Sequence, residues 1–266
     1  MKEFITRTIT AFFLIIGAFA LIKYVPLHYF SIVLFVIISA AAFELVKLAQ
    51  PGTSSMLIIF FNGIVTACAF TFGKPDLMLA AIIILVSNGV FFLFSIKQKE
   101  QLNTFIKDIG IHFLVIFYLY VPLYFLFKLK ELHSNYLFFL IFVIAIGDSA
   151  AYFFGKAFGK HKIYPVASPN KSLEGLIAAV IFAAASGWLS VIIFPVQVKI
   201  WTAVITGGII GGLSQLSDPI ESLFKRAADK KDSGSLLPGH GGILDRVDSY
   251  IFCAPVLFYI IDYFWK

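Results

Sequence analysis

Residues 173–194 read LEGLIAAVIFAAASGWLSVIIF, and after Glu174 this stretch carries no charged side chain. A helix needs about 20 mostly apolar residues to cross the hydrocarbon core of a lipid bilayer, so the stretch predicts a membrane-spanning helix. Eight further stretches of similar character occur at 5–22, 27–46, 55–73, 77–96, 109–127, 135–155, 199–217 and 249–265. The sequence therefore predicts an all-α, polytopic integral membrane protein with about nine transmembrane helices.

The composition of the whole chain supports the same class. Of the 266 residues, 60% are apolar and only 14% are charged, whereas soluble domains are about 45–50% apolar and about 25% charged. The excess apolar surface has no interior large enough to hold it, which excludes an ordinary soluble domain. The chain has two cysteines, Cys68 and Cys253, both inside apolar runs, which excludes a disulfide scaffold.

The distribution of lysine and arginine predicts how the chain is oriented. With nine spans, 15 of these residues fall in the N-terminus and the even-numbered loops, and 6 fall on the opposite side. Positive charge marks the cytoplasmic face, so we expect a protein of the cytoplasmic (inner) membrane with its N-terminus and even loops in the cytoplasm and its C-terminus outside. A cleavable signal peptide ending near Ala18-Phe19-Ala20 is the alternative interpretation of the start, and it would leave eight spans.

Ionisable side chains divide the chain into two parts. Residues 1–134 supply about five spans with little ionisable content beyond Glu44 and His112, and we interpret them as a membrane scaffold and dimer surface. Residues 135–266 supply about four spans and two polar loops. Charge is costly inside an apolar chain, so we expect the second part to be the catalytic region, on the cytoplasmic side.

The loop 218–248 is the most polar region of the sequence. Asp218, Pro219 and, three residues after Asp218, Glu221 together predict a helix start with Asp218 as the N-cap. Apolar residues then recur at helical spacing opposite the charged ones. We therefore expect a short helix in the membrane interface, with its basic side chains toward lipid headgroups.

The end of this loop contains groups suited to a polyphosphate. The segment His240-Gly241-Gly242 lies in a Gly-rich stretch whose free N–H groups can form an anion-binding nest. Asp245 and Asp248 share one face if the last helix has begun, and with Asp218 they provide three carboxylates, the ligand type that Mg²⁺ requires. Taken singly, these groups also fit ordinary roles, as a helix cap or a surface ion-pair cluster. Basic partners for a nucleotide would be Lys225, Arg226, Lys231 and Arg246.

The loop 156–172 repeats this pattern more weakly. Lys171 and Ser172 precede the next span, where a helix N-terminus favours phosphate. Asp148 lies well inside the preceding span, and an intramembrane acid is a candidate functional residue. The alternative for Asp148 is a buried partner for a lysine or serine on another helix.

At these residues the sequence resembles the CDP-diacylglycerol synthase family, also called the phosphatidate cytidylyltransferases. Every position of the family signature between Ser222 and Asp248 is satisfied, whereas Pro219 beside Asp218 departs from the pattern that relatives commonly show. Flanking motifs from Gly147-Asp148 to Gly159 and from Ser168 to Glu174-Gly175 also resemble the family. The resemblance covers about the last 120 residues at the level of motifs.

The resemblance implies a Mg²⁺-dependent nucleotidyltransferase of phospholipid synthesis, which transfers CMP from CTP or dCTP to phosphatidate and releases pyrophosphate. It also implies a second cation (K⁺ or Mg²⁺) and a homodimer that contacts membrane lipids and not nucleic acid. The implied catalytic residues are Asp218, Lys225, Asp245 and Asp248, and the three aspartates among them would bind metal. The implied substrate-binding residues are Lys171, Ser172, Ser222, Arg226, Lys231, Asp232, His240, Gly241, Gly242 and Arg246. Additional candidates are Asp148, Glu174 and Glu221.

Two other functions compete with this interpretation. An ion-coupled transporter would explain Asp148 and the polar run from Ser214 to Asp218, but it would concentrate polar groups near the bilayer midplane. Here most polar groups fall in the two predicted cytoplasmic loops. Another lipid phosphotransferase, such as a polyprenyl-phosphate sugar-phosphate transferase, would also pair Mg²⁺ carboxylates with basic loops, and only the family resemblance argues against it.

Overall fold

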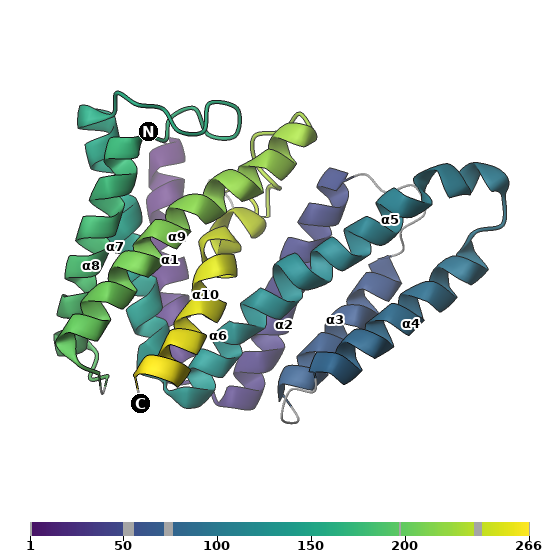
Figure 1. Ribbon diagram of the computed structural model, residues 1–266, viewed down its shortest axis with the longest axis horizontal. Coiled ribbons are helices and arrows are strands. Elements are labelled where there is room, and N and C mark those ends of the chain that lie inside the picture. The colour runs from purple at the N-terminus through teal and green to yellow at the C-terminus, as the bar shows by residue number, and fades with distance from the viewer. Residues whose placement is uncertain (1, 50–55, 72–76, 197, 237–240, 266) are drawn as a thin grey trace. The chain divides into compact units, whose positions relative to one another are not determined.

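The computed structural model describes residues 2–49, 56–71, 77–196, 198–236 and 241–265 (Figure 1). Over these ranges the regular secondary structure is helical and includes no strand, and an isolated β-bridge joins Lys162 and Ser172. The chain divides into two compact units. The first comprises Met1–Phe127 and Asp232–Leu244, and the second comprises Lys128–Lys231 and Asp245–Lys266. The division at residue 134 that the sequence suggests stays a prediction.

The first unit consists of apolar helices. They are α1 (Lys2–Lys23), α2 (Leu27–Ala49), α3 (Met56–Thr71), α4 (Leu77–Ser95) and a continuous helical run made of η1 (Lys99–Gln101), α5 (Leu102–Leu114), η2 (Val115–Tyr120) and the beginning of α6 (Val121–Leu132). The segment η1 is a 3₁₀ turn and η2 is a π-helical segment. Helices α3 and α4 run side by side (Figure 1), and residues 72–76 between them lie outside the described part of the chain.

Apolar side chains occur on every side of helix α2. Leu34, Ile38 and Leu45 recur at helical spacing and are buried within the protein. Val36 and Phe43, on other faces of the helix, are at least half exposed. A helix with apolar residues all round is buried in a large core or in a membrane. Because the exposed side chains in this unit are so often apolar, lipid is the solvent that these helices require.

The second unit consists of Lys128–Leu132 of α6, then α7 (Ser134–Phe158), α8 (Leu173–Ile193), α9 (Ile200–Ala227) and α10 (Leu244–Phe264) from Asp245 onward. Helices α7, α8 and α9 lie side by side (Figure 1). Glycine makes this packing close: a Cβ at Gly187 of α8 would lie 3.2 Å from the Cα of Gly207 on α9. Small residues let membrane helices approach backbone to backbone, so we regard α7–α9 as a tightly packed three-helix group.

Six helices in the described part of the chain are long and apolar enough to cross a membrane, and three apolar helices are shorter. The chain is therefore a multi-pass membrane protein, and the predicted all-α class is confirmed. The six are Leu27–Ala49, Lys99–Leu132, Ser134–Phe158, Leu173–Ile193, Ile200–Ala227 and Leu244–Phe264. The shorter ones are Thr10–Lys23, Met56–Thr71 and Leu79–Ser95. All nine predicted stretches fall on helices, while the number of spans stays a prediction.

The predicted interfacial helix beginning at Asp218 is wrong. Helix α9 continues without interruption from Ile200 to Ala227, with Pro219 inside it. A proline in a helix leaves the carbonyl four residues earlier without its usual N–H donor, and here the ammonium group of Lys171 donates to that carbonyl, which belongs to Gln215, at 3.4 Å. This replacement donor explains how the helix tolerates the proline.

The last helix also begins earlier than predicted, at Leu244 instead of residue 249. Asp245 and Asp248 are thus both helical, which meets the condition for their sharing a face. Among the described residues of the predicted loop 218–248, only 228–236 and 241–243 are non-helical. Likewise, the loop between α7 and α8 begins at Gly159, because residues 156–158 belong to α7.

Candidate active site

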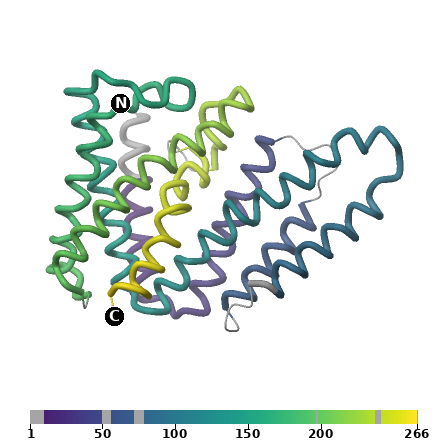
Figure 2. The backbone as a smooth tube through the Cα atoms, in the orientation of Figure 1, coloured from purple at the N-terminus to yellow at the C-terminus, as the bar shows by residue number. Residues whose placement is uncertain are grey.

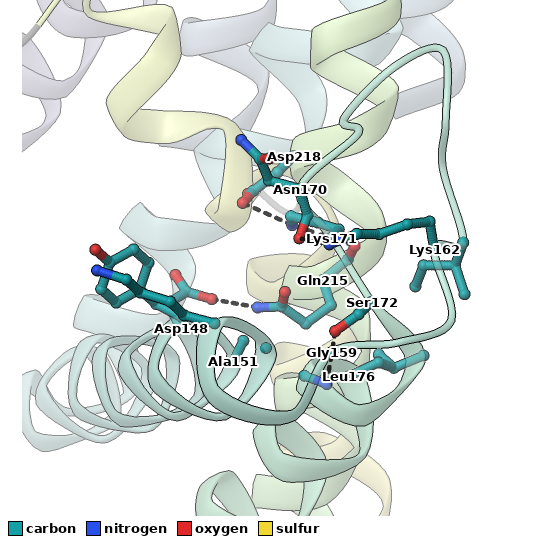
Figure 3. Close-up of a pocket in the computed structure, with 15 residues that line it drawn as sticks. Asp148, Ala151, Gly159, Lys162, Asn170, Lys171, Ser172, Leu176, Gln215 and Asp218 are labelled. Carbon is teal, nitrogen blue, oxygen red and sulfur yellow. Dashed lines mark hydrogen bonds and ion pairs between the residues drawn. The ribbon is translucent and has the colours of Figure 1, made fainter.

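A cavity of about 600 Å³ lies in the second unit, where the end of α7, the start of α8 and the middle of α9 meet (Figure 3). Its lining includes charged side chains although the three helices are largely apolar. The acidic side chains in the lining are Asp148 and Asp218, and three lysines contribute to it. The lining residues are Asp148, Ala151, Tyr152, Gly155, Lys156, Gly159, Lys162, Ile163, Asn170, Lys171, Ser172, Gly175, Leu176, Gln215 and Asp218.

The loop 159–172 connects the end of α7 to the start of α8 (Figure 2). Two side chains hold it in place. The Ser172 hydroxyl caps α8 by accepting a hydrogen bond from the Gly175 N–H at 3.3 Å. The Glu174 carboxylate accepts bonds from the N–H groups of Lys160 and His161, at 3.1 and 3.3 Å, and pairs with the His161 ring at 2.6 Å. Glu174 therefore anchors the loop and does not line the cavity.

Lys171 is the basic group that is best held in the cavity. Its ammonium nitrogen lies 2.9 Å from Oδ2 of Asp218, and it also donates to the Gln215 carbonyl described above (Figure 3). Its side chain is 19% exposed, so a charged group faces the cavity with little freedom. The prediction that Lys171 and Ser172 lie at a helix N-terminus is confirmed in position, because Ser172 is the cap of α8.

Asp148 lies on the wall of the same cavity. Its Oδ1 accepts hydrogen bonds from Nε2 of Gln215 at 2.6 Å and from the Ser214 hydroxyl at 3.2 Å. Asp148 is thus the buried partner of a serine on another helix, as the alternative interpretation expected, and its functional role stays a prediction. Gln215 connects Asp148 with Lys171, because its side chain donates to Asp148 and its carbonyl accepts from Lys171.

Asp218 also joins α9 to the beginning of α10. Its Oδ1 accepts a bond from the Ser249 hydroxyl at 2.9 Å, while the Ser249 N–H donates to Oδ1 of Asp248 at 2.8 Å. The Ser217 hydroxyl donates to the backbone carbonyl of Asp248. Ser249 thus places two of the predicted metal ligands close together.

A second ion-pair group lies one to two turns further along α9. The Lys225 ammonium group contacts the carboxylates of Glu221, on its own helix, and of Asp245 on α10, the latter at 2.7 Å. The side chain of Glu221 is fully buried and those of Lys225 and Asp245 are 11% and 10% exposed. Lys225 therefore links the two helices through charges that are mostly removed from solvent.

The carboxylates of this region suit a hard cation. Asp218, Glu221, Asp245 and Asp248 lie along the facing parts of α9 and α10, and the charges of Asp218 and Glu221 both act on Asp248. Oε1 of Glu221 is buried without a hydrogen-bond donor among the described residues. Carboxylate oxygens are the ligands that Mg²⁺ prefers in proteins. No three acidic, histidine or cysteine side chains converge as a metal-binding group in the described ranges, so the three-aspartate metal site stays a prediction.

The other predicted substrate-binding residues are placed differently. Ser222 is half-buried on α9, and Arg226 is exposed and donates to the Lys230 carbonyl at 3.1 Å. Lys231 and Arg246 are also exposed. Asp232, Gly241 and Gly242 belong to the first unit, where Gly241 has a φ of 81°, a value that favours glycine. His240 lies outside the described residues.

The sequence analysis did not single out Gln215 or Ser249 as site residues. Gln215 lies in the polar run that suggested a transporter. It also lies four residues before Pro219, which has no N–H group, so within a helix its carbonyl needs a donor from elsewhere. Ser249 had no such signal, since a serine at the start of a membrane helix is common.

Apolar helices long enough to cross a membrane, with a cavity between them that is lined by lysine and aspartate side chains, define an integral membrane protein with a charged internal cavity. A sequence profile of the cytidylyltransferase family matches residues 5–264. The chain belongs to this family, as the motif resemblance indicated.

Three relatives illustrate the relationship, and each is named phosphatidate cytidylyltransferase. The protein of Bacillus subtilis (strain 168) is 30% identical over 249 residues, which cover 88% of this chain and 89% of the relative. The protein of Staphylococcus saprophyticus is 34% identical over 182 residues, 68% of either chain. The protein of Staphylococcus haemolyticus is 42% identical over 123 residues, which cover 46% of this chain and 47% of the relative.

Proposed function

We propose that this chain is a phosphatidate cytidylyltransferase, which converts CTP or dCTP and phosphatidate into the corresponding CDP- or dCDP-diacylglycerol and pyrophosphate. The cytidylyltransferase family and the names of its relatives support this activity. The observation that carries it is Lys171, a cation held between Asp218 and the Gln215 carbonyl in a cavity between membrane helices. A cation in such a position suits the phosphate group of a lipid, or the phosphates of a nucleotide that reacts with a lipid.

The reaction makes one bond and breaks one. An oxygen of the phosphatidate phosphate attacks the α-phosphorus of CTP, and the bond from that phosphorus to the oxygen bridging the β-phosphate breaks. Pyrophosphate leaves with the bridging oxygen and its electron pair. Such a transfer requires little covalent chemistry from the protein, which accelerates it mainly by positioning the reactants and neutralising charge.

Lys171 and Lys225 would neutralise phosphate charge from fixed positions, because each is already oriented by acidic partners. Asp218, Asp245 and Asp248 would hold Mg²⁺, which when bound neutralises charge on the pyrophosphate group. Asp148 and Glu221 are additional candidate site residues, and a second cation, K⁺ or Mg²⁺, is part of the proposal. The remaining substrate contacts would come from Ser172, Ser222, Arg226, Lys231, Asp232, His240, Gly241, Gly242 and Arg246.

We further propose that the N-terminus and the polar loops face the cytoplasm, where CTP is available, and that the C-terminus lies outside the cytoplasmic membrane. The excess of lysine and arginine on the even loops supports this orientation. A homodimer, with residues 1–134 as its surface, completes the proposal.

The experiment is release of pyrophosphate by the purified protein in mixed micelles with phosphatidate, with CTP, dCTP, UTP or ATP and with or without Mg²⁺. We expect Mg²⁺-dependent turnover with the cytidine nucleotides only. A folded protein that turns over none of the nucleotides would contradict the proposal, and ion flux through reconstituted vesicles would then test the transporter alternative. Turnover of a nucleotide sugar with polyprenyl phosphate would instead support the other lipid phosphotransferase.

A further inference from the structure

Glu44 is a buried acid in the first unit, near the end of helix α2. Glu44 is only 3% exposed. Its carboxylate accepts three hydrogen bonds from described residues. The Ser233 hydroxyl donates to Oε2 at 2.8 Å, the Leu244 N–H donates to Oε2 at 2.9 Å, and the Ile243 N–H donates to Oε1 at 3.1 Å. All three donors are neutral, and no ion pair to Glu44 occurs within the part of the chain that the structure describes.

The three donors come from the two ends of one segment, Asp232–Leu244, of which residues 237–240 are not described. Ser233 is near its beginning, and Ile243 and Leu244 form its end. Leu244 is also the first residue of α10, so its N–H and that of Ile243 are donors that the helix itself leaves without partners. A carboxylate placed there is favoured both by these bonds and by the helix dipole.

The segment has glycines where the Glu44 carboxylate needs room. A Cβ at Gly234 would lie 2.8 Å from Cδ of Glu44, and a Cβ at Gly242 would lie 2.7 Å from the same atom. These distances are shorter than side chains tolerate, so the backbone of the segment approaches the carboxylate closely at both ends. One carboxylate therefore contacts the segment both at its beginning and at its end.

We propose that Glu44 is a positioning residue of the cytidylyltransferase site, which fixes the ends of the segment Asp232–Leu244 and thereby the Gly241-Gly242 backbone and the start of α10. Gly242 immediately precedes Ile243, and Asp245 immediately follows Leu244, so restraint of these two amides restrains their covalent neighbours. The link to catalysis rests on the proposed function, because Gly242 and Asp245 are site residues in that proposal. The restraint itself does not rest on it.

The direct test is hydrogen–deuterium exchange of the detergent-solubilised protein, without substrate, at the amides of Ile243 and Leu244. In Glu44→Ala we expect these amides to exchange about 10- to 100-fold faster, the factor that one hydrogen bond to a charged group contributes. Glu44→Gln, which keeps one acceptor oxygen, should give an intermediate increase. The matched control is Asp108→Asn, which alters another fully buried acid of the same unit, on α5.

Asp108→Asn should leave exchange at Ile243 and Leu244 unchanged even if it lowers the unfolding temperature by a similar amount. Unchanged exchange at these amides in a folded Glu44→Ala protein would overturn the proposal. So would equal acceleration in the Asp108→Asn control, because the effect would then reflect general destabilisation.

A double-mutant cycle provides a second readout. Gly234→Ala adds a methyl group against the Glu44 carboxylate and should accelerate exchange at the segment ends, whereas in a Glu44→Ala background the same change should have no further effect. Additive effects would contradict the contact. For turnover, we expect Glu44→Ala to lower kcat/KM for CTP about 10- to 100-fold, as removal of an orienting partner commonly does. Altered exchange with full activity would refute the catalytic role and leave the proposed function intact.

Discussion

Replacement of Lys225 by methionine tests the charge link between α9 and α10. The substitution keeps an unbranched side chain of similar length and removes the ammonium group. Two carboxylates then lose their cation: Glu221, whose side chain is fully buried, and Asp245, whose side chain is 10% exposed. Because both acids remain in place, the variant isolates the cost of leaving buried negative charge without a partner.

The magnitude follows from the burial of the three groups. Removal of one partner from a buried ion pair costs about 3–5 kcal/mol, since an uncompensated charge remains in a medium of low dielectric constant. One kcal/mol lowers the unfolding temperature of a chain of this size by about 2–4 °C. We therefore expect Lys225→Met to unfold about 6–20 °C below the parent protein. Neutralising one of the acids, in Glu221→Gln/Lys225→Met, should recover at least about 1 kcal/mol.

The assay is thermal unfolding in detergent, followed by helical circular dichroism. Lys225→Arg keeps the charge and should remain close to the parent, and Lys231→Met is the matched control because it removes a lysine from an exposed position. The reasoning is refuted if Lys225→Met unfolds within about 2 °C of the Lys231→Met control, or if the added Glu221→Gln change lowers stability further instead of restoring it.

The remaining predictions concern the cavity, the helix packing and the orientation. Lys171→Ala should lower kcat/KM for CTP about 10- to 100-fold at unchanged helical content, and a normal rate in the pyrophosphate assay would remove Lys171 from the site. Gly187→Ala should lower the unfolding temperature by several degrees, because the added Cβ would meet the backbone of α9. In the control Gly208→Ala the added Cβ would lie 3.6 Å from the Cβ of Ala184, so the unfolding temperature should not fall, and equal shifts in the two variants would contradict the packing. A C-terminal tag should be cleaved by protease added outside intact cells, and protection would overturn the orientation.

Much of the fold was predictable because apolar length decides it. Each of the nine predicted stretches lies on a helix, since a run of about 20 apolar residues has few alternatives in a membrane. The cavity residues Lys171, Asp148 and Asp218 were predictable for a related reason. Ionisable groups in such a sequence are rare and costly, so those that occur are candidates for function.

The errors arose where tertiary contacts override local signals. Asp218, Pro219 and Glu221 have the pattern of a helix start, yet α9 passes through them, because a lysine from another loop supplies the donor that the proline removes. No local pattern reveals a partner 44 residues away along the chain. Glu44 was likewise assigned to a scaffold, although an acid within a predicted span was itself a signal that it needed polar partners.

One of the two acceptors that hold Lys171, the Gln215 carbonyl, belongs to the main chain, and this has a consequence for how mutations can affect the cavity. Every amino acid at position 215 would present the same carbonyl, so substitution there changes the bonds to Asp148 but retains the oxygen facing Lys171. Only a residue at position 219 that has an N–H group could compete for that oxygen. The bond from Lys171 to this carbonyl therefore does not depend on which residue stands at position 215, but it does depend on the proline one helical turn further along α9.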